Sequence, residues 1–146
     1  MYSRILVPLD GSHAAEDAIP VAVALARRSR AEIQLAFVHV GVGFGIATAA
    51  ELIDFGELDA VQSEDEAAYL ARVTARTAAE PNVCVVSHHL GGPVVPALAS
   101  HAAAGKVDLI VMSTHGRGRV GRLWLGSVAD ELIRAVDVPV LLLRMS

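Results

Sequence analysis

Apolar runs rich in valine, isoleucine and leucine alternate along this chain with segments of helical periodicity. The runs lie at residues 4–9, 33–40, 83–88, 107–112 and 138–144. Strands interleaved with helices are typical of a parallel, doubly wound α/β sheet. The stretches 109–111 and 140–143 are continuously apolar, which indicates strands covered on both faces. We therefore predict a single five-stranded parallel sheet with helices on both faces.

The segments between these runs carry signals for helix starts and stops. Ser12 is a good N-cap for a helix that reaches about residue 29. Further helices are expected over about residues 58–79, from Gly92-Pro93 to residue 104, and over residues 127–136. These helices supply the connections that a parallel sheet needs.

Length and composition limit the class of protein. The 146 residues fit one domain, 1–146. Because 53% of the residues are hydrophobic and only 19% are charged, the composition excludes a disordered chain. A net charge of −4 argues against general nucleic-acid binding. No apolar run reaches the roughly 18–20 residues that span a bilayer, and the first residues do not resemble a signal peptide. We therefore expect a cytoplasmic location, with Cys84, the single cysteine, as a buried core thiol.

The segment most informative about function follows the fourth apolar run. Residues 113–126 are rich in glycine and arginine and lead to a helix expected to begin at Gly126-Ser127. Glycine lets the backbone approach a ligand, arginine matches phosphate oxygens, and a helix N-terminus offers free N–H groups. The segment therefore predicts a phosphate site. Because ligands bind where the strand order reverses, residues 8–11 after the first strand should lie beside it.

Three other interpretations fit this loop less well. Gly116, Gly118 and Gly121 spell the dinucleotide-binding pattern, but the expected helix starts after the third glycine. Residues 121–127 resemble a P-loop that lacks its lysine. A glycine-rich surface turn, with arginines present only for solubility, is the third interpretation.

Other reactive side chains form no recognisable site in the sequence. His88 and His89 are neighbours on a strand and point to opposite faces, so they cannot bind one metal ion together. Ser127 fits a helix N-cap better than a nucleophile, since no nucleophile-elbow motif surrounds it. No catalytic base or pair of carboxylates accompanies the loop, so we predict neither catalytic residues nor a metal site.

Several short motifs, by their order and spacing, resemble the universal stress protein family over essentially the whole chain. They are ILVPLDGS at 5–12, VHV at 38–40, GGP at 91–93, DLIVMSTHG at 108–116, LGSV at 125–128 and VPV at 138–140. The resemblance implies the strand order 3-2-1-4-5. It also implies binding of an adenine nucleotide, which would be ATP, AMP or ADP, with or without Mg²⁺.

Nucleotide-binding members of that family share a loop of Gly, two residues, Gly, nine residues, Gly and then Ser or Thr. This chain keeps the spacing, but Ser113 replaces the first glycine. If the position needs a positive φ or a very close ligand contact, serine weakens binding. If the position ends the strand in an extended conformation, serine is tolerated and its hydroxyl can bond a phosphate. We expect tolerance, because the rest of the loop is preserved.

The resemblance also implies roles for individual residues. Pro8, Leu9 and Asp10 would line the adenine and ribose side, and Val40 would meet the adenine edge through its backbone. The ribose and phosphates would be bound by Met112, Ser113, Thr114, His115, Gly116, Arg117, Gly118 and Arg119. The phosphate tail would be held at a helix N-terminus by Gly126, Ser127, Val128 and Ala129.

The last strand is expected at an edge of the sheet, where its apolar stretch from Val138 to Leu143 invites pairing with a second copy. The resemblance implies a homodimer formed in this way. We predict an adenine-nucleotide-binding stress-response regulator or adaptor that is not a dedicated enzyme, with an unknown client protein. The alternatives are a dimeric interaction module without nucleotide binding and a slow ATP-hydrolysing enzyme.

Overall fold

The computed structural model describes residues 1–41, 49–114 and 121–144. Its strands form one sheet in the order β3-β2-β1-β4-β5, and each neighbouring pair is parallel. The predicted doubly wound architecture and strand order are therefore confirmed. The elements, in chain order, are β1 (Arg4–Leu9), α1 (His13–Glu16), α2 (Ile19–Ser29), β2 (Glu32–His39), α3 (Ala49–Ala78), β3 (Cys84–Gly91), α4 (Val94–Ala104), β4 (Leu109–Thr114), α5 (Gly121–Ala135) and β5 (Val140–Arg144).

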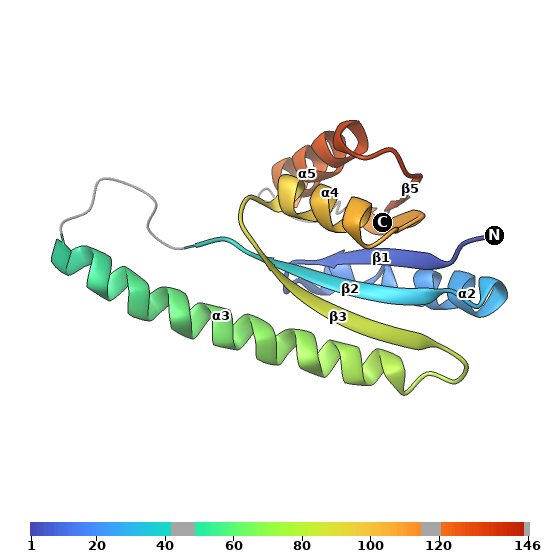
Figure 1. Cartoon of the computed structure of the whole chain (residues 1–146), viewed down its shortest axis with the longest axis horizontal. Helices are drawn as coiled ribbons and strands as arrows, with labels where there is room; N and C mark the ends of the chain where they lie inside the picture. The colour runs from blue at the N-terminus through green and yellow to red at the C-terminus, as the bar shows by residue number, and fades with distance from the viewer. Residues whose placement is uncertain (42–48, 115–120, 145–146) are drawn as a thin grey trace.

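The sheet separates two hydrophobic cores, one on each face. On one face Ile5, Val7 and Val111 pack with residues of α1, α2 and α3. On the other face Leu6 and Ile110 pack with residues of α4 and α5. Figure 1 shows the α4–α5 layer above the strands and the long α3 below them. Since successive strand residues point to opposite faces, burial on both sides explains the unbroken apolar runs in the sequence.

The first helix of the chain differs from the expectation of one helix to residue 29. Ser12 does cap it, because the Ser12 hydroxyl oxygen accepts a bond from the Ala15 N–H at 3.2 Å. The helix nevertheless ends at Glu16, and α2 starts at Ile19 with Pro20 in its first turn. Proline has no N–H and its ring clashes with the carbonyl four residues earlier, so a continuous helix cannot pass through Pro20.

Two further boundaries differ from the sequence expectation. Helix α3 begins at Ala49 rather than near residue 58, and it continues through Gly56. Figure 1 shows that its first half extends beyond the end of the sheet. Strand β3 runs three residues beyond His88, to Gly91. Cys84 begins this edge strand and is exposed, so the expectation of a buried core thiol was wrong.

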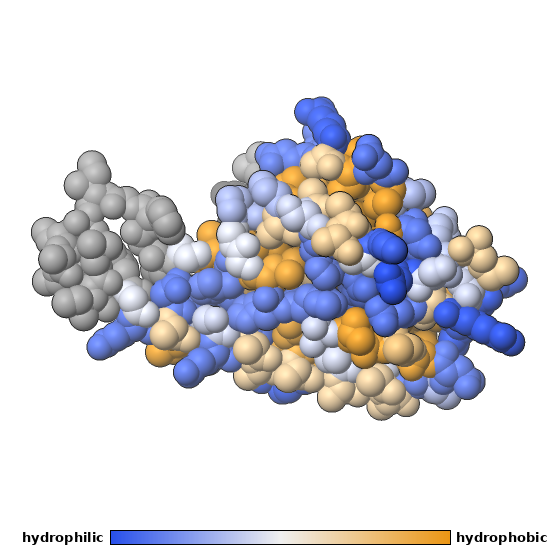
Figure 2. All heavy atoms as spheres, in the orientation of Figure 1, coloured by the Kyte–Doolittle hydropathy of each residue, from blue (hydrophilic) through white to orange (hydrophobic). Residues whose placement is uncertain are grey.

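The surface carries separate apolar patches. Figure 2 shows hydrophobic residues reaching the surface above and below a hydrophilic band across the middle of the molecule. The exposed large apolar side chains include Leu58 and Val61 on α3 and Leu141 and Leu142 on β5. Among the residues that the structure describes, no helix combines the length and apolarity needed to cross a membrane.

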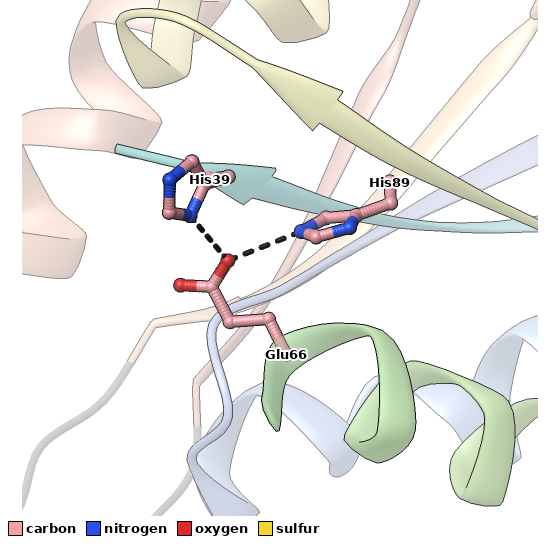
Figure 3. A group of neighbouring side chains, drawn as sticks. All are labelled: His39, Glu66 and His89. Carbon is pink, nitrogen blue, oxygen red and sulfur yellow. Dashed lines mark hydrogen bonds and ion pairs between the residues drawn. The ribbon is translucent and has the colours of Figure 1, made fainter. Parts of the chain in front are cut away.

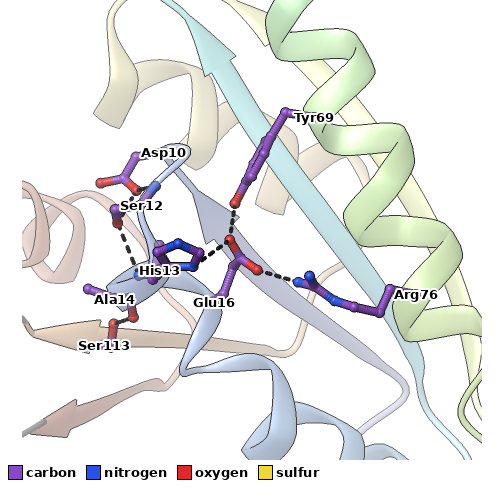
Figure 4. Close-up of polar contacts among 9 residues, drawn as sticks. Asp10, Ser12, His13, Ala14, Glu16, Tyr69, Arg76 and Ser113 are labelled. Atoms are coloured by element: carbon purple, nitrogen blue, oxygen red, sulfur yellow. Dashed lines mark hydrogen bonds and ion pairs between the residues drawn. The ribbon is translucent and has the colours of Figure 1, made fainter.

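A partly buried carboxylate joins α1 to α3 beside the turn after β1. Glu16 accepts a hydrogen bond from the Tyr69 hydroxyl at 2.8 Å and pairs with the Arg76 guanidinium (Figure 4). The Glu16 side chain is 13% exposed, so these partners replace much of its hydration. Burial and the Glu16 carboxylate raise the pKa of the Tyr69 hydroxyl, which therefore stays protonated and acts as a donor. The contact fixes α1 against the long helix.

Replacing Tyr69 by phenylalanine should lower the free energy of unfolding by about 1.5 kcal/mol, because the Glu16 carboxylate loses a hydrogen bond inside the fold. Chemical denaturation at pH 7 measures the change. Tyr2→Phe is the matched control, since the Tyr2 hydroxyl has no hydrogen-bond partner in the described part of the chain. Equal stability of the Tyr69→Phe variant and the wild type would contradict the proposed contact.

Candidate functional site

A cavity of about 290 Å³ lies at the carboxyl ends of the central strands. Strands β1, β2 and β4 all contribute to its wall, so it sits at the point where the strand order reverses. Most of the lining is apolar, with Asp10, Gln62, Glu66 and Ser113 as polar groups. The full lining is Pro8, Leu9, Asp10, Ala15, Ala36, Phe37, Val38, Val40, Gln62, Glu66, Val94, Leu98, Met112, Ser113 and Val128.

The structure brings together part of the predicted site. The predicted residues that line the cavity are Pro8, Leu9, Asp10, Val40, Met112, Ser113 and Val128. Two others do not line it: the Thr114 hydroxyl bonds the Leu143 carbonyl at 3.3 Å, and Ala129 is buried in the α4–α5 core. His115, Gly116, Arg117, Gly118 and Arg119 lie outside the described residues. Gly126 and Ser127 fall within α5.

Several lining residues were missed by the sequence analysis. Gln62 and Glu66 are one helical turn apart on α3 and close the cavity from the side of that helix. Their spacing, i and i+4 on one helix face, was visible in the sequence. What the sequence did not reveal was that this face of α3 crosses the ends of β2 and β3. Val94 and Leu98 of α4 complete the opposite wall.

The turn after β1 holds Asp10 in one orientation. Its Oδ1 accepts hydrogen bonds from the Ser12 N–H at 2.9 Å and the Ser12 hydroxyl at 2.5 Å (Figure 4). Gly11 has a φ of +88°, a conformation that other residues adopt only with strain. The carboxylate is exposed, and its second oxygen has no hydrogen bond to the described residues. This oxygen can accept a bond from a ligand hydroxyl.

The conformation of Ser113 shows whether serine can replace the glycine of the family pattern at this position. It lies within β4 opposite Leu143 of β5, and its φ is not positive. It is 2% exposed, and its hydroxyl donates to the Ala14 carbonyl of α1. A serine therefore fits this position without backbone strain. Since the hydroxyl proton is directed at Ala14, the oxygen can only accept from a ligand, so Ser113 is not set up to donate to a phosphate.

Helix α5 begins at Gly121, so the expected helix start at Gly126-Ser127 was wrong. Residues 122–125 are Arg, Leu, Trp and Leu, which include strong helix formers, and one internal glycine costs only about 1 kcal/mol. Only the first four N–H groups of a helix lack an acceptor within it. Ser127, Val128 and Ala129 come later, so their N–H groups do not form a helix N-terminus, and Ser127 is not an N-cap.

A polar cluster borders the cavity beside Glu66. The Glu66 Oε2 lies 2.7 Å from Nδ1 of His39 and 3.1 Å from Nε2 of His89, and Nε2 of His39 lies 2.9 Å from Asp59 Oδ1. Figure 3 shows the two imidazoles directed at the carboxylate from the neighbouring strands β2 and β3. His88 points to the other face, where the centroid of its ring lies 4.3 Å from the ring centroid of His101 on α4. The predicted opposite orientation of His88 and His89 is confirmed.

The cluster shifts the pKa of two of its members. The hydrogen bond to the Glu66 carboxylate is the largest influence on the pKa of His39, and together with Asp59 it raises the pKa of the imidazole despite partial burial. Burial is the largest influence on Glu66 and acts to raise its pKa. The hydrogen bonds from Gln62, His89 and His39 outweigh burial, so the pKa of this carboxyl is lowered. Glu66 is therefore a carboxylate at neutral pH.

Solved structures of other proteins share this fold. The universal stress protein UspA from Lactobacillus plantarum has a TM-score of 0.83 at 23% identity, with 98% of each chain covered. A universal stress protein in complex with cAMP has a TM-score of 0.68 at 23% identity, covering 99% of this chain and 98% of that one. The Archaeoglobus fulgidus protein in complex with dAMP has a TM-score of 0.62 at 20% identity, with 97% of each chain covered.

Sequence comparison agrees with the fold. The model of the universal stress protein family matches residues 1–144. The universal stress protein MJ0531 of Methanocaldococcus jannaschii is 30% identical over 99% of this chain and 83% of its own length. A universal stress protein of Thermus aquaticus is 44% identical over 55 residues, which are 38% of this chain and 40% of that protein. The chain therefore belongs to the universal stress protein family.

Proposed function

We propose that this protein binds an adenine nucleotide, with ATP, ADP and AMP as candidates, and acts as a stress-response regulator or adaptor. The cavity at the carboxyl ends of β1, β2 and β4 is the observation that carries the proposal. At about 290 Å³ it is close to the lower end of the range for small-molecule sites. The cAMP and dAMP complexes of two similarly folded proteins support an adenine nucleotide as the ligand.

The chemistry of the cavity wall suits a nucleoside. Adenine is flat and largely apolar on its faces, and Ala36, Val38 and Leu98 offer apolar surface to it. Val40 would bind the edge of the base through its backbone. The free oxygen of Asp10 would accept a hydrogen bond from a ribose hydroxyl, because its other oxygen is already bonded to Ser12.

We propose that the phosphates extend from the end of β4 along the loop to Arg119. Arg117 and Arg119 supply positive charge there, and Gly116 and Gly118 let the backbone approach, as the sequence predicts. Mg²⁺ would accompany the phosphates of ATP. A regulator that senses nucleotide needs binding but no turnover, so no catalytic residue is proposed.

The test first asks whether the purified protein retains a bound nucleotide, and then titrates the stripped protein with nucleotides. Freshly purified protein is denatured and the released small molecules are identified by mass; an adenine nucleotide is expected. Stripped protein is then titrated with ATP, ADP and AMP, each with and without Mg²⁺. At about a hundredfold excess over Kd, the ligand should stabilise the fold by about 2.7 kcal/mol. Absence of both released nucleotide and ligand-induced stabilisation would overturn the proposal and favour an interaction module without nucleotide.

Restoring glycine at position 113 should change nucleotide affinity little. Ser113 is extended and directs its hydroxyl proton at Ala14, so Ser113→Gly is expected to keep the ATP Kd within about threefold. The same substitution should lower the free energy of unfolding by about 1 kcal/mol or more, since a buried hydrogen bond and a buried side chain are lost. Isothermal titration and denaturation measure the two effects. A tenfold gain in affinity would show that the serine weakens binding.

We also propose a homodimer formed through β5. This strand lies at the edge of the sheet, and Leu141 and Leu142 are 37% and 38% exposed. An apolar edge strand with unpaired backbone groups is a template for pairing with another strand. A second copy of the chain would cover these side chains and continue the sheet.

Leu142→Lys should convert the dimer to a monomer, because two lysines would meet at the proposed interface. Sedimentation equilibrium at micromolar concentration measures the mass. Val61→Lys on α3 is the control, since it introduces the same charge at an apolar side chain that is 56% exposed and distant from β5 in sequence. A wild-type protein of monomeric mass would refute the proposed dimer.

A further inference from the structure

The side chains of His39, Glu66 and His89 meet although they come from three separate elements. His89 pairs in register with Phe37, and His39 lies two residues beyond Phe37 on β2. Residues two apart on a strand share a face, so both imidazoles point to the face that α3 covers. Glu66 of α3 reaches between them, and the two ring centroids are 6.0 Å apart (Figure 3).

We propose that His39, Glu66 and His89 form a binding site for a divalent transition-metal ion of the zinc class. Two imidazoles and one carboxylate are a common ligand set for such ions. One ligand atom from each residue lies within 4.8 Å of the others. In a tetrahedral site with bonds of about 2.0–2.1 Å, ligand atoms are about 3.4 Å apart, so small side-chain rotations suffice to admit an ion.

The groups behind these ligands support a metal site. Metal-binding histidines usually donate their second ring N–H to a carboxylate, which fixes the ring and its tautomer. Here Asp59 lies 2.9 Å from Nε2 of His39, which leaves Nδ1 directed at Glu66. Gln62 donates to Glu66 Oε1 at 3.0 Å and orients the carboxylate in the same way. Both a histidine ligand and the carboxylate ligand are thus held by a second residue.

Partial burial of the three side chains favours binding of a metal ion and leaves one side of the proposed site open. The exposed fractions of the side chains are 16% for His39, 11% for Glu66 and 24% for His89. A carboxylate with so little water around it gains from a cation placed at its oxygen. Because Glu66 and Gln62 also line the cavity, a fourth coordination position would face it and take water. Three protein ligands with one open position differ from the closed four-ligand sites that serve only structure.

The ligand set also selects the class of ion. Imidazole nitrogen suits Zn²⁺, Co²⁺, Ni²⁺ and Cu²⁺, whereas Mg²⁺ and Ca²⁺ prefer oxygen ligands throughout. The proposed ion is therefore distinct from the Mg²⁺ that would accompany ATP phosphates. The inference goes beyond the proposed nucleotide function and does not depend on it.

The test uses full-length, untagged protein that has been stripped with a chelator and holds no nucleotide. Titration with Zn²⁺ should show one saturable site per chain with a Kd in the micromolar range or tighter, and millimolar Mg²⁺ should not compete. Co²⁺ should give visible absorption bands of a four- or five-coordinate ion. No saturable binding of Zn²⁺, together with the spectrum of hydrated Co²⁺, would reduce the cluster to a hydrogen-bonded ion pair and overturn the proposal.

Variants assign the ligands. His89→Gln and Glu66→Gln should each weaken Zn²⁺ binding at least about 100-fold, and Asp59→Asn should weaken it about 10–100-fold while keeping the stoichiometry. His88→Gln is the matched control, because His88 neighbours His89 but faces α4. Circular dichroism verifies that each variant folds. Equal loss of affinity in the His88 and His89 variants would place the ion elsewhere and contradict the assignment.

Discussion

Replacing Val128 by tryptophan is expected to weaken ATP binding by at least about 100-fold, or about 2.8 kcal/mol. Val128 lies in α5 and lines the cavity, which measures only about 290 Å³. An indole at this position would occupy much of the space proposed for the nucleoside, and the close packing around Leu98 and Met112 leaves little room for adjustment. Isothermal titration with ATP measures the loss.

Ile133→Trp is the matched control for this substitution. Ile133 lies on the same helix, is 45% exposed and does not line the cavity. The Ile133→Trp variant should bind ATP with the wild-type Kd. Any loss of ATP affinity in the Val128 variant can then be attributed to the filled cavity and not to a damaged helix. If Val128→Trp keeps wild-type affinity while remaining folded, the nucleotide binds somewhere else.

Leu132→Ala should lower the free energy of unfolding by about 2–5 kcal/mol. Leu132 is fully buried in the core between α4, α5 and the sheet, where it packs with Leu6, Leu98 and Ile110. Removing its branched end takes away buried apolar surface and leaves a cavity that tight surroundings cannot fill. Thermal unfolding should show a midpoint lower by several degrees, since about 2–4 °C accompany each kcal/mol in a domain of this size.

The neighbouring residue again provides the control. Ile133→Ala removes a side chain that is nearly half exposed, and it should change stability by less than about 0.5 kcal/mol. A comparable loss in both variants would mean that the destabilisation does not come from loss of core packing at Leu132, because alanine itself favours a helix. Nucleotide should be absent from these measurements, because a bound ligand adds to the measured stability.

One wrong helix boundary was placed at a glycine. Gly126 was expected at the start of a helix, yet α5 runs through it, as α3 runs through Gly56. An internal glycine costs about 1 kcal/mol, which favourable neighbours and packing can outweigh. Pro20 shows the opposite case, because its missing N–H and its ring cannot be accommodated in a helix interior, and the chain breaks before it.

The sequence predicted only the part of the cavity wall that the strands form. Pro8, Asp10 and Ser113 follow or end predicted strands, and parallel strands deliver such residues to one edge of the sheet. Gln62 and Glu66 come from a helix whose crossing angle and length no periodicity specifies. Their part in the wall, and the exposure of Cys84 on an edge strand, depend on how α3 lies on the sheet.

By itself, the sequence determined the parallel sheet, its strand order through family resemblance, and the edge of the sheet where the cavity lies. These follow from local patterns, since an apolar run fixes a strand and the βαβ connection fixes its direction. Only the tertiary structure decided that His39 and His89 meet Glu66, which lies 27 residues after the first and 23 before the second. Such contacts depend on strand register and helix placement, which are set by the packing of the whole core and not by any local segment.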